Sequence, residues 1–154
     1  LDQINIDGAL LVSYIGHSAK TNWAHELLLD LAALPELENE GQLPIALGMT
    51  CLEGHFHQPE VGFESLAEAS VRKAEGGMVA SWSATGLGLA SGHDYLEQGL
   101  FLALFQKDVQ ELGAAATQGK LYLVANTPAG AYDDLVDTYV LFGDPGLHVH
   151  LAGP

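Results

Sequence analysis

The stretch that decides the fold is "ALLVSYIGHS", residues 9–18, in which an almost continuous apolar run stops at a glycine, a histidine and a serine. The apolar part has the length of a β-strand, and residues 44–50, "PIALGMT", and 77–83, "GMVASWS", have the same character. Such runs are typical of strands that are covered on both faces, as in a parallel sheet. The sequence therefore predicts three buried strands.

Helical patterns separate these strands. Residues 23–34 carry leucines at helical spacing and stop before a proline, and residues 65–74 carry a similar pattern that ends before two glycines. Alternating strands and helices favour a parallel sheet with right-handed crossovers over a sandwich or a helix bundle. We therefore predict an α/β fold of three layers, α/β/α, with a mainly parallel sheet.

The second half of the chain predicts two helices, at residues 94–112 and 114–125, and a terminal strand at 147–151. Two glycine-containing segments are interpreted as loops rather than ligand sites. Residues 85–92, "TGLGLASG", lack the further glycine and the lysine of a phosphate-binding loop, and residues 142–146, "FGDPG", have the composition of a tight turn. No linker divides the chain, so residues 1–154 are expected to form a single domain.

The composition disfavours several classes of protein. Five Lys and Arg against 20 Asp and Glu give a formal net charge of −15, which repels nucleic acid and anionic membrane surfaces. No apolar run is long enough to span a membrane, and residues 1–20 lack the basic start of a signal peptide. The chain begins at Leu1, so an upstream targeting segment stays open, and a single cysteine leaves the compartment undecided.

A histidine and the only cysteine follow two of the predicted strands. His17 lies just beyond the first strand, and Cys51 follows the second strand 34 residues later, about the length that one crossover connection requires. Because functional groups collect beyond the carboxyl ends of parallel strands, we expect both side chains to face one crevice. A nearby imidazole can activate a thiol as a nucleophile. The alternative is that Cys51 is a small buried hydrophobic residue.

Four segments of the chain together resemble the catalytic domain of the gingipain-type cysteine peptidases, which have a caspase-like fold. The segments are "GALLVSYIGHSAKTNWAHELL" (8–28), "LPIALGMTCLEGHF" (43–56), "SLAEASVRKAEGGMVASWSATG" (65–86) and "TYVLFGDPGLHVHL" (138–151). They occur in the family's order and extend over nearly the whole chain. The resemblance implies that the chain is the C-terminal portion of a catalytic unit whose upstream part is missing.

The resemblance also implies roles for particular residues. Cys51 would attack a peptide carbonyl to form a thioester, with His17 assisting proton transfer. The oxyanion would be stabilised by the backbone N–H groups of Cys51 and Ser18. Serine replaces the family's usual glycine at position 18, which is a poorer fit if the turn demands a positive φ or a close approach of the backbone to the substrate. The acid that orients the histidine in better-known relatives would lie upstream of this chain.

The walls of a specificity pocket are expected near Met49, Thr50 and Trp82, although the end of a buried strand pattern favours a core position for Trp82. The leading function is a cysteine endopeptidase that is secreted or held at the cell surface and acts on protein or peptide substrates. An inactive interaction or assembly module of the same fold is the alternative. A cytoplasmic caspase-like relative is a third, which the "GDP" ending disfavours.

No metal or other cofactor is expected. The pairs His55/His57 and His148/His150 invite a zinc site, but zinc usually takes four ligands at a recognisable spacing, and no such partners are evident. Calcium is motivated only by the acids within residues 133–137, which lack the alternating pattern of a calcium loop and equally suit the solvated start of a helix.

Overall fold

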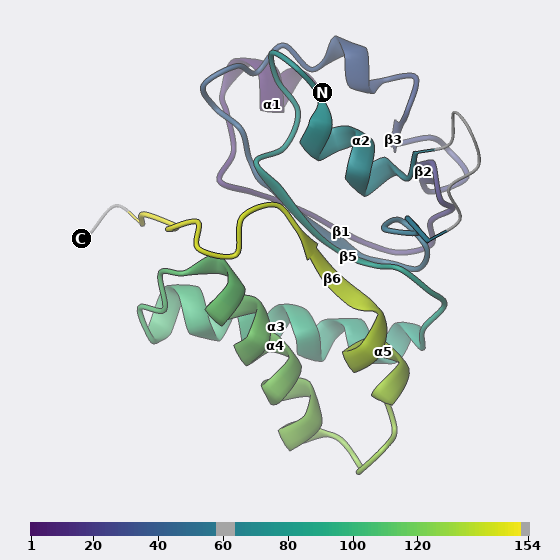
Figure 1. Ribbon diagram of the computed structural model, residues 1–154, viewed down its shortest axis with the longest axis vertical. Coiled ribbons are helices and arrows are strands. Elements are labelled where there is room, and N and C mark those ends of the chain that lie inside the picture. Colours follow the sequence, from purple (N-terminus) through teal and green to yellow (C-terminus); the bar gives the residue numbers. More distant parts are fainter. Residues whose placement is uncertain (58–63, 152–154) are drawn as a thin grey trace.

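The computed structural model describes residues 1–57 and 64–151 (Figure 1). Four strands form one sheet in the order β1-β4-β5-β6, and β2 and β3 form a separate two-stranded ribbon. The strands are β1 (Leu11–Ile15), β2 (Asn22–Trp23), β3 (Leu29–Asp30), β4 (Ile45–Met49), β5 (Ala80–Ala84) and β6 (Tyr139–Phe142). The helices are α1 (Asp2–Ile6), α2 (Leu66–Arg72), α3 (His93–Gln106), α4 (Leu112–Asn126) and α5 (Asp133–Thr138), with short 3-10 turns η1 (Leu34–Glu36) and η2 (Ala90–Gly92).

The predicted three-layer α/β architecture is confirmed. Helices α1 and α2 lie on one side of the sheet, and α3, α4 and α5 lie on the other (Figure 1). Alternate side chains of the central strands point to opposite faces of the sheet and belong to two hydrophobic cores. Leu47 and Trp82 pack in the core with α3 and α4, whereas Ala46 packs in the core with α2 and the β2–β3 ribbon. This division follows from the alternation of side chains along a strand.

The three predicted strands are confirmed as β1, β4 and β5, and they are parallel, with Ile15 opposite Met49. All five residues of β4 and of β5 are buried, whereas β1 is a partly exposed edge strand. The fourth strand, β6, runs antiparallel to β5 and was not predicted. The strand predicted at 147–151 was wrong, because those residues contribute only an isolated bridge between His148 and Glu111.

The helix predicted at residues 23–34 was also wrong. This segment holds β2, a run of turns and β3, because Ala24 and Leu27 have left-handed backbones with φ of 59° and 56°. Two of the leucines that produced the helical spacing, Leu27 and Leu28, are 56% and 63% exposed instead of covering the core. The ribbon instead places Trp23 inside the fold, at 5% exposure.

The remaining helices agree with expectation more closely. Helix α2 begins with a capping box between Ser65 and Glu68, which satisfies two backbone donors at its first turn. Helix α3 ends at Gln106, six residues before the predicted end, and left-handed Asp108 (φ 54°) begins the connection to α4. The loop predicted at 85–92 ends in η2, and the turn predicted at 142–146 starts at the last residue of β6; in it the Gly146 N–H donates to Asp144 Oδ1 over 2.8 Å.

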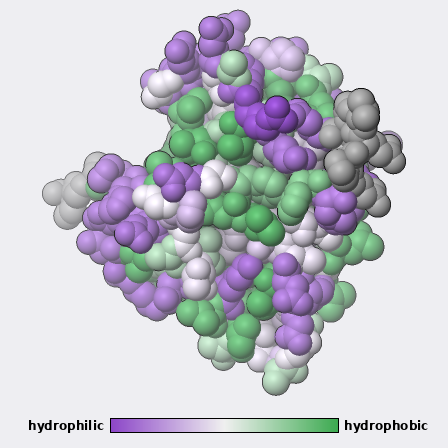
Figure 2. All heavy atoms as spheres, viewed as in Figure 1, coloured by the Kyte–Doolittle hydropathy of each residue, from purple (hydrophilic) through white to green (hydrophobic). Residues whose placement is uncertain are grey.

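Helices α3 and α4 pack closely through small residues. A Cβ atom on Gly99 would lie 2.8 Å from Gly119 Cα, so only glycine permits this approach. On the face shown in Figure 2, apolar side chains gather in a band across the middle of the molecule, at the level of the sheet in Figure 1. Among residues 1–57 and 64–151, no helix combines the length and the apolar character needed to cross a membrane.

Candidate active site

The candidate site lies where β1 and β4 end. The Gly16 N–H donates to the Met49 carbonyl over 3.4 Å, so the parallel pairing continues one residue past β1. Since Ile15 is opposite Met49, His17 and Cys51 are each two residues beyond this matched pair. The predicted proximity of the two strand ends is confirmed, because the strands are direct neighbours at their carboxyl ends.

Residues 16–24, the His17 loop, return along themselves as a narrow hairpin. The His17 carbonyl accepts hydrogen bonds from the Ala24 N–H over 2.9 Å and from the Tyr14 hydroxyl over 3.0 Å. Ser18 is paired with Trp23 across the hairpin. The His17 side chain is exposed, and within the described residues nothing hydrogen-bonds to its ring.

Residues 50–56, the Cys51 loop, turn sharply after β4. Leu52 adopts a left-handed conformation with φ of 61°, and its N–H donates to the Gly86 carbonyl over 3.1 Å, beyond the end of β5. The Gly54 N–H donates to the Ala84 carbonyl over 2.9 Å. Cys51 is a free, partly exposed thiol whose Sγ lies 3.5 Å from the Gly88 carbonyl. Cys51 is therefore neither fully buried nor fully exposed.

Ser18 connects the two loops. Its single hydroxyl proton is within reach of two acceptors, Thr50 Oγ1 at 2.8 Å and the Cys51 carbonyl oxygen. Ser18 is not among the residues with positive φ, so the conformation of its backbone does not require glycine. Among the described residues, no group accepts a hydrogen bond from the backbone N–H of Ser18 or of Cys51.

The predicted pocket residues lie in the interior. Thr50 and Met49 are fully buried, and Trp82 is 1% exposed. The Trp82 ring packs edge-on against Tyr139 with centroids 5.4 Å apart, and the space beside it exists only because Gly119 has no side chain. The sequence suggested the walls of a specificity pocket at these residues; in this chain all three are enclosed, and Trp82 belongs to the core between β5 and α4.

Glu53 is a site residue that the sequence analysis missed. Its side chain is buried at 1% exposure and accepts hydrogen bonds from Trp23 Nε1 (2.6 Å), Ser83 Oγ (3.2 Å) and Thr50 Oγ1 (3.4 Å). Burial raises the pKa of Glu53 from an ordinary 4.5 to about 7, while these three hydrogen bonds oppose the shift. The signal was an acid two residues after Cys51 and four residues after the end of the apolar strand β4.

Tyr139 and His93 support the Cys51 loop from beneath. The Tyr139 hydroxyl donates to the carbonyls of Gly48 (3.0 Å) and Thr50 (3.3 Å), and burial raises its pKa well above the usual value. The His93 ring lies 5.7 Å from the Tyr139 ring, and burial lowers the pKa of His93 despite the nearby Asp94 and Asp134. Both groups are therefore uncharged near neutral pH.

No metal centre is evident among residues 1–57 and 64–151, where three metal-ligating side chains nowhere converge. His55 and His57 are close, with centroids 3.9 Å apart, but His55 Nδ1 is already 3.0 Å from the Thr85 carbonyl. His148 lies 3.8 Å from the Glu111 carboxylate. Asp134 accepts a hydrogen bond from the Leu89 N–H over 3.0 Å.

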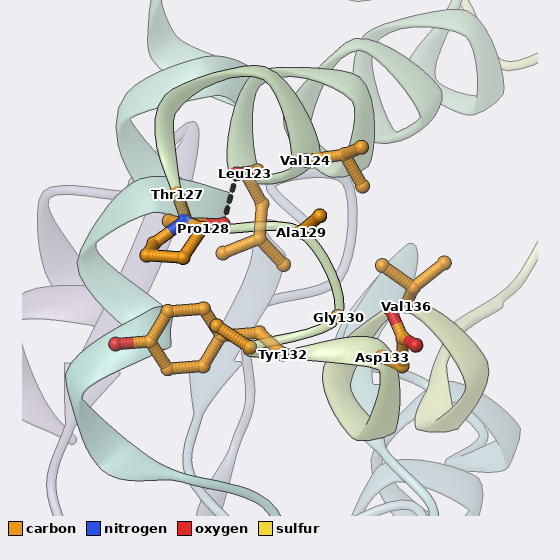
Figure 3. Close-up of a pocket in the computed structure, with 10 residues that line it drawn as sticks. Leu123, Val124, Thr127, Pro128, Ala129, Gly130, Tyr132, Asp133 and Val136 are labelled. Carbon is orange, nitrogen blue, oxygen red and sulfur yellow. Dashed lines mark hydrogen bonds between the residues drawn. The ribbon is translucent and has the colours of Figure 1, made fainter.

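One small hollow lies away from the two loops, where α4 connects to α5 (Figure 3). Leu123, Pro128 and Tyr132 line it, and Thr127 Oγ1 closes one side by donating to the Leu123 carbonyl over 2.7 Å. Its volume is about 20 Å³, whereas a single water needs roughly 10–15 Å³. The hollow is too small for a peptide side chain.

Known proteins match this chain in sequence and in structure. The model of Peptidase family C25 matches residues 1–150. The crystal structure of the Arg-specific cysteine proteinase gingipain R (RgpB) has a TM-score of 0.80 at 25% identity, covering 97% of this chain and 35% of that one. A complex of Porphyromonas gingivalis RgpB pro- and mature domains has a TM-score of 0.80 at 25% identity, covering 97% and 36% of the two chains.

A third structure, described only as a protease, has a TM-score of 0.83 at 20% identity over 97% of this chain and 37% of that one, and it supports the fold alone. This chain thus spans little more than a third of each of these relatives. A search of curated protein sequences finds no match. The arrangement of strands and helices is the caspase-like fold of the gingipains. Because the family model extends over residues 1–150 of the 154, the chain belongs to peptidase family C25, the gingipain-type cysteine peptidases.

Proposed function

We propose that this chain is part of the catalytic domain of a cysteine endopeptidase in which Cys51 is the nucleophile and His17 the proton-transfer group. The observation that carries the proposal is the parallel pairing of β1 with β4, which brings both residues to the same edge of the sheet at matched positions. The thiol is partly exposed and the imidazole exposed, so a peptide can approach both from solvent.

The proposed reaction proceeds through a thioester. Cys51 Sγ attacks the peptide carbonyl, and its proton passes to His17, which delivers a proton to the departing amine. Water then hydrolyses the thioester and regenerates the thiol. The tetrahedral oxyanion would be stabilised by the backbone N–H groups of Ser18 and Cys51, which have no other acceptor within the described residues.

The substrates we propose are proteins or peptides with cationic side chains near the cleaved bond. A formal net charge of −15 attracts such substrates at long range. The similar gingipain R is described as Arg-specific, so arginine is the first residue to test. The charge alone does not distinguish arginine from lysine.

We further propose that a segment outside residues 1–154 completes the catalytic unit, at the cell surface or after secretion. The sheet has an open edge at β1, where Leu10 and Ile15 are 44% and 50% exposed. An added strand would pair with this edge and cover those side chains. Such a segment would also supply the group that orients the His17 ring.

The test is covalent labelling of the full-length protein by peptidyl acyloxymethyl ketones with arginine, lysine or leucine next to the reactive carbon, with the adduct mapped by mass spectrometry. We expect labelling of Cys51 by the cationic probes, lost in Cys51→Ala and strongly slowed in His17→Ala. His25→Ala, which removes a neighbouring exposed histidine, is the matched control and should label normally. Labelling no faster than that of a free thiol would overturn the proposal in favour of an inactive interaction module of the same fold.

A further inference from the structure

We propose that Glu53 is the positioning residue that joins the His17 loop to the Cys51 loop, acting from beneath the site through Trp23 and through Thr50 to Ser18. The inference rests on the proposed function, because it concerns the alignment of the same two loops. Glu53 itself is buried and touches no substrate, so its role is exerted through these neighbours.

The contacts form a closed ring. Glu53 Oε2 accepts from Trp23 Nε1 over 2.6 Å and from Thr50 Oγ1 over 3.4 Å. Thr50 Oγ1 lies 2.8 Å from Ser18 Oγ, and Ser18 is paired with Trp23 across the hairpin. One carboxylate oxygen thus reaches Ser18, the neighbour of His17, by two independent routes.

The fold provides a place for this carboxyl group. A Cβ on Gly48 would lie 2.6 Å from Glu53 Cδ and closer still to the nearer oxygen, so the strand is open only where glycine stands. The other oxygen, Oε1, accepts from Ser83 Oγ over 3.2 Å, and Ser83 Oγ is 2.7 Å from Ser81 Oγ. Serines are unusual in the fully buried strand β5, and here they contact the acid or one another.

Proton exchange at Glu53 would change the strength of the ring. When Glu53 is protonated, its proton can lie on Oε1 and be donated to Ser83, whose hydroxyl then donates to Ser81. When it is ionised, the bonds that Oε2 accepts from Trp23 and Thr50 become charge-assisted and stronger. Burial raises the pKa of Glu53 to about 7, so the ring tightens as the pH rises through neutrality.

Other titratable groups face Glu53 from the elements around it. Tyr139 on β6 interacts electrostatically with Glu53 and also with Cys51 and Glu97. His93, at the start of α3, packs against Tyr139, and burial lowers its pKa. Tyr14 on β1 stacks on Trp23 at 5.1 Å, and the His17 imidazole lies in the neighbouring loop. The experiment must therefore measure a signal that reports directly on the hydrogen bond between Trp23 Nε1 and Glu53.

The experiment follows the indole Nε1–H resonance of Trp23 by NMR in full-length protein labelled with ¹⁵N-tryptophan, assigned with Trp23→Phe. Trp82 is the internal reference because it lies in the other core. We expect the Trp23 resonance to move with a midpoint near pH 7 in the wild type and in His17→Ala, and to stay constant in Glu53→Gln. The matched control Glu111→Gln, an exposed acid distant from the ring, should titrate as the wild type does.

The same variants are then acylated with the peptide probe. Glu53→Gln should slow the limiting rate of Cys51 acylation by about tenfold, the scale of one lost charge-assisted hydrogen bond, without weakening binding of the probe. Trp23→Phe keeps the acid but removes a bond that lowers its pKa, so the pH midpoint of acylation should rise. If Glu53→Gln does not fold, this shift is the deciding measurement.

A Trp23 resonance that does not titrate, an acylation rate in Glu53→Gln equal to that in Glu111→Gln, or an unshifted midpoint in Trp23→Phe would each overturn the role of Glu53. Failure of the proposed function looks different. In that case no variant is acylated by the peptide probe, but the Trp23 resonance still titrates with Glu53.

Discussion

The Cys51 loop and the His17 loop lie at the ends of neighbouring strands but are held in different ways. The Cys51 loop is tied to the sheet by its own backbone, through Leu52 and Gly54 to the continuation of β5 and through the Tyr139 hydroxyl beneath. Thr50, Glu53 and His55 are all buried. The loop that carries Cys51 is therefore held by bonds to buried parts of the sheet.

The His17 loop begins on an edge strand, and its backbone is hydrogen-bonded both within the hairpin and to residues outside it, among them Met49, Leu31 and Leu66. Its contacts with the rest of the fold include the Lys20 carbonyl, which accepts from the Leu66 N–H, the Ser18 hydroxyl and the Trp23 indole. Two of these three contacts reach Glu53 or its partner Thr50. The comparison shows that the Cys51 loop is bonded directly to the ends of β5 and β6, whereas the side chains of the His17 loop meet the Cys51 loop through Ser18 and Trp23.

The largest change in stability should come from a substitution that fills the space in which the Glu53 carboxyl group lies. Gly48→Ala would force the Cβ against the Glu53 carboxyl group, and we expect a loss of about 3 kcal/mol in the free energy of unfolding because neither the central strand nor the ring can move freely. Urea denaturation measures this change. Gly146→Ala, whose Cβ would meet nothing nearer than 3.3 Å, is the control. Equal stability of the two variants would contradict the ring geometry.

The second test uses the pH dependence of stability. The pKa of Glu53 is about 7 in the fold and near 4.5 when unfolded, so the folded protein holds the extra proton between these values. The contribution is fully present below pH 4.5 and is lost as the pH rises through 7, a change of about 3 kcal/mol. Relative to Glu53→Gln, the wild type should therefore lose stability over this window. A pH-independent difference between the two would show that Glu53 is not buried in this way.

Part of this arrangement was readable from the sequence. The strands β1, β4 and β5 were predicted because fully covered strands are continuous apolar runs, and parallel pairing then placed His17 and Cys51 together. The same continuity concealed which face each side chain occupies, since no alternation is visible in a strand buried on both sides. That is why the sequence left both a pocket and the core open for Trp82, which the structure places in the core.

The rest depended on contacts between distant residues. The conformation of residues 22–30 is linked to Trp23, whose partner Glu53 is 30 positions away, and local leucine spacing carries no information about that contact. Strand β6 has only four residues and pairs with β5 across more than fifty intervening residues. Periodicity is a local signal, so it predicted a helix in the first case and missed the strand in the second.

A smaller effect should follow from separating the two loops at Ser18. Ser18→Ala removes the hydroxyl that contacts Thr50 and the Cys51 carbonyl but keeps the backbone N–H, so we expect a loss of about 1 kcal/mol in stability and a severalfold slower acylation of Cys51. Ser91→Ala, which removes an exposed serine bonded to Tyr132, is the control. If Ser18→Ala and Ser91→Ala had the same stability and the same acylation rate, the Ser18 hydroxyl would contribute nothing to the alignment of the two loops.

The smallest expected change in the free energy of unfolding tests the conformation of the segment between β2 and β3, and the sign of the change is what decides. Leu27 is exposed and has a φ of 56°, a conformation that costs a leucine about 1 kcal/mol but costs glycine almost nothing. Because glycine also loses more entropy on folding, Leu27→Gly should raise the free energy of unfolding by only about 0.5 kcal/mol. Leu28→Gly, at an exposed neighbour without positive φ, should lower it instead. In the helix that leucine spacing predicts, both substitutions would destabilise by about 1 kcal/mol, so opposite signs in urea denaturation would confirm the ribbon that carries Trp23 to Glu53.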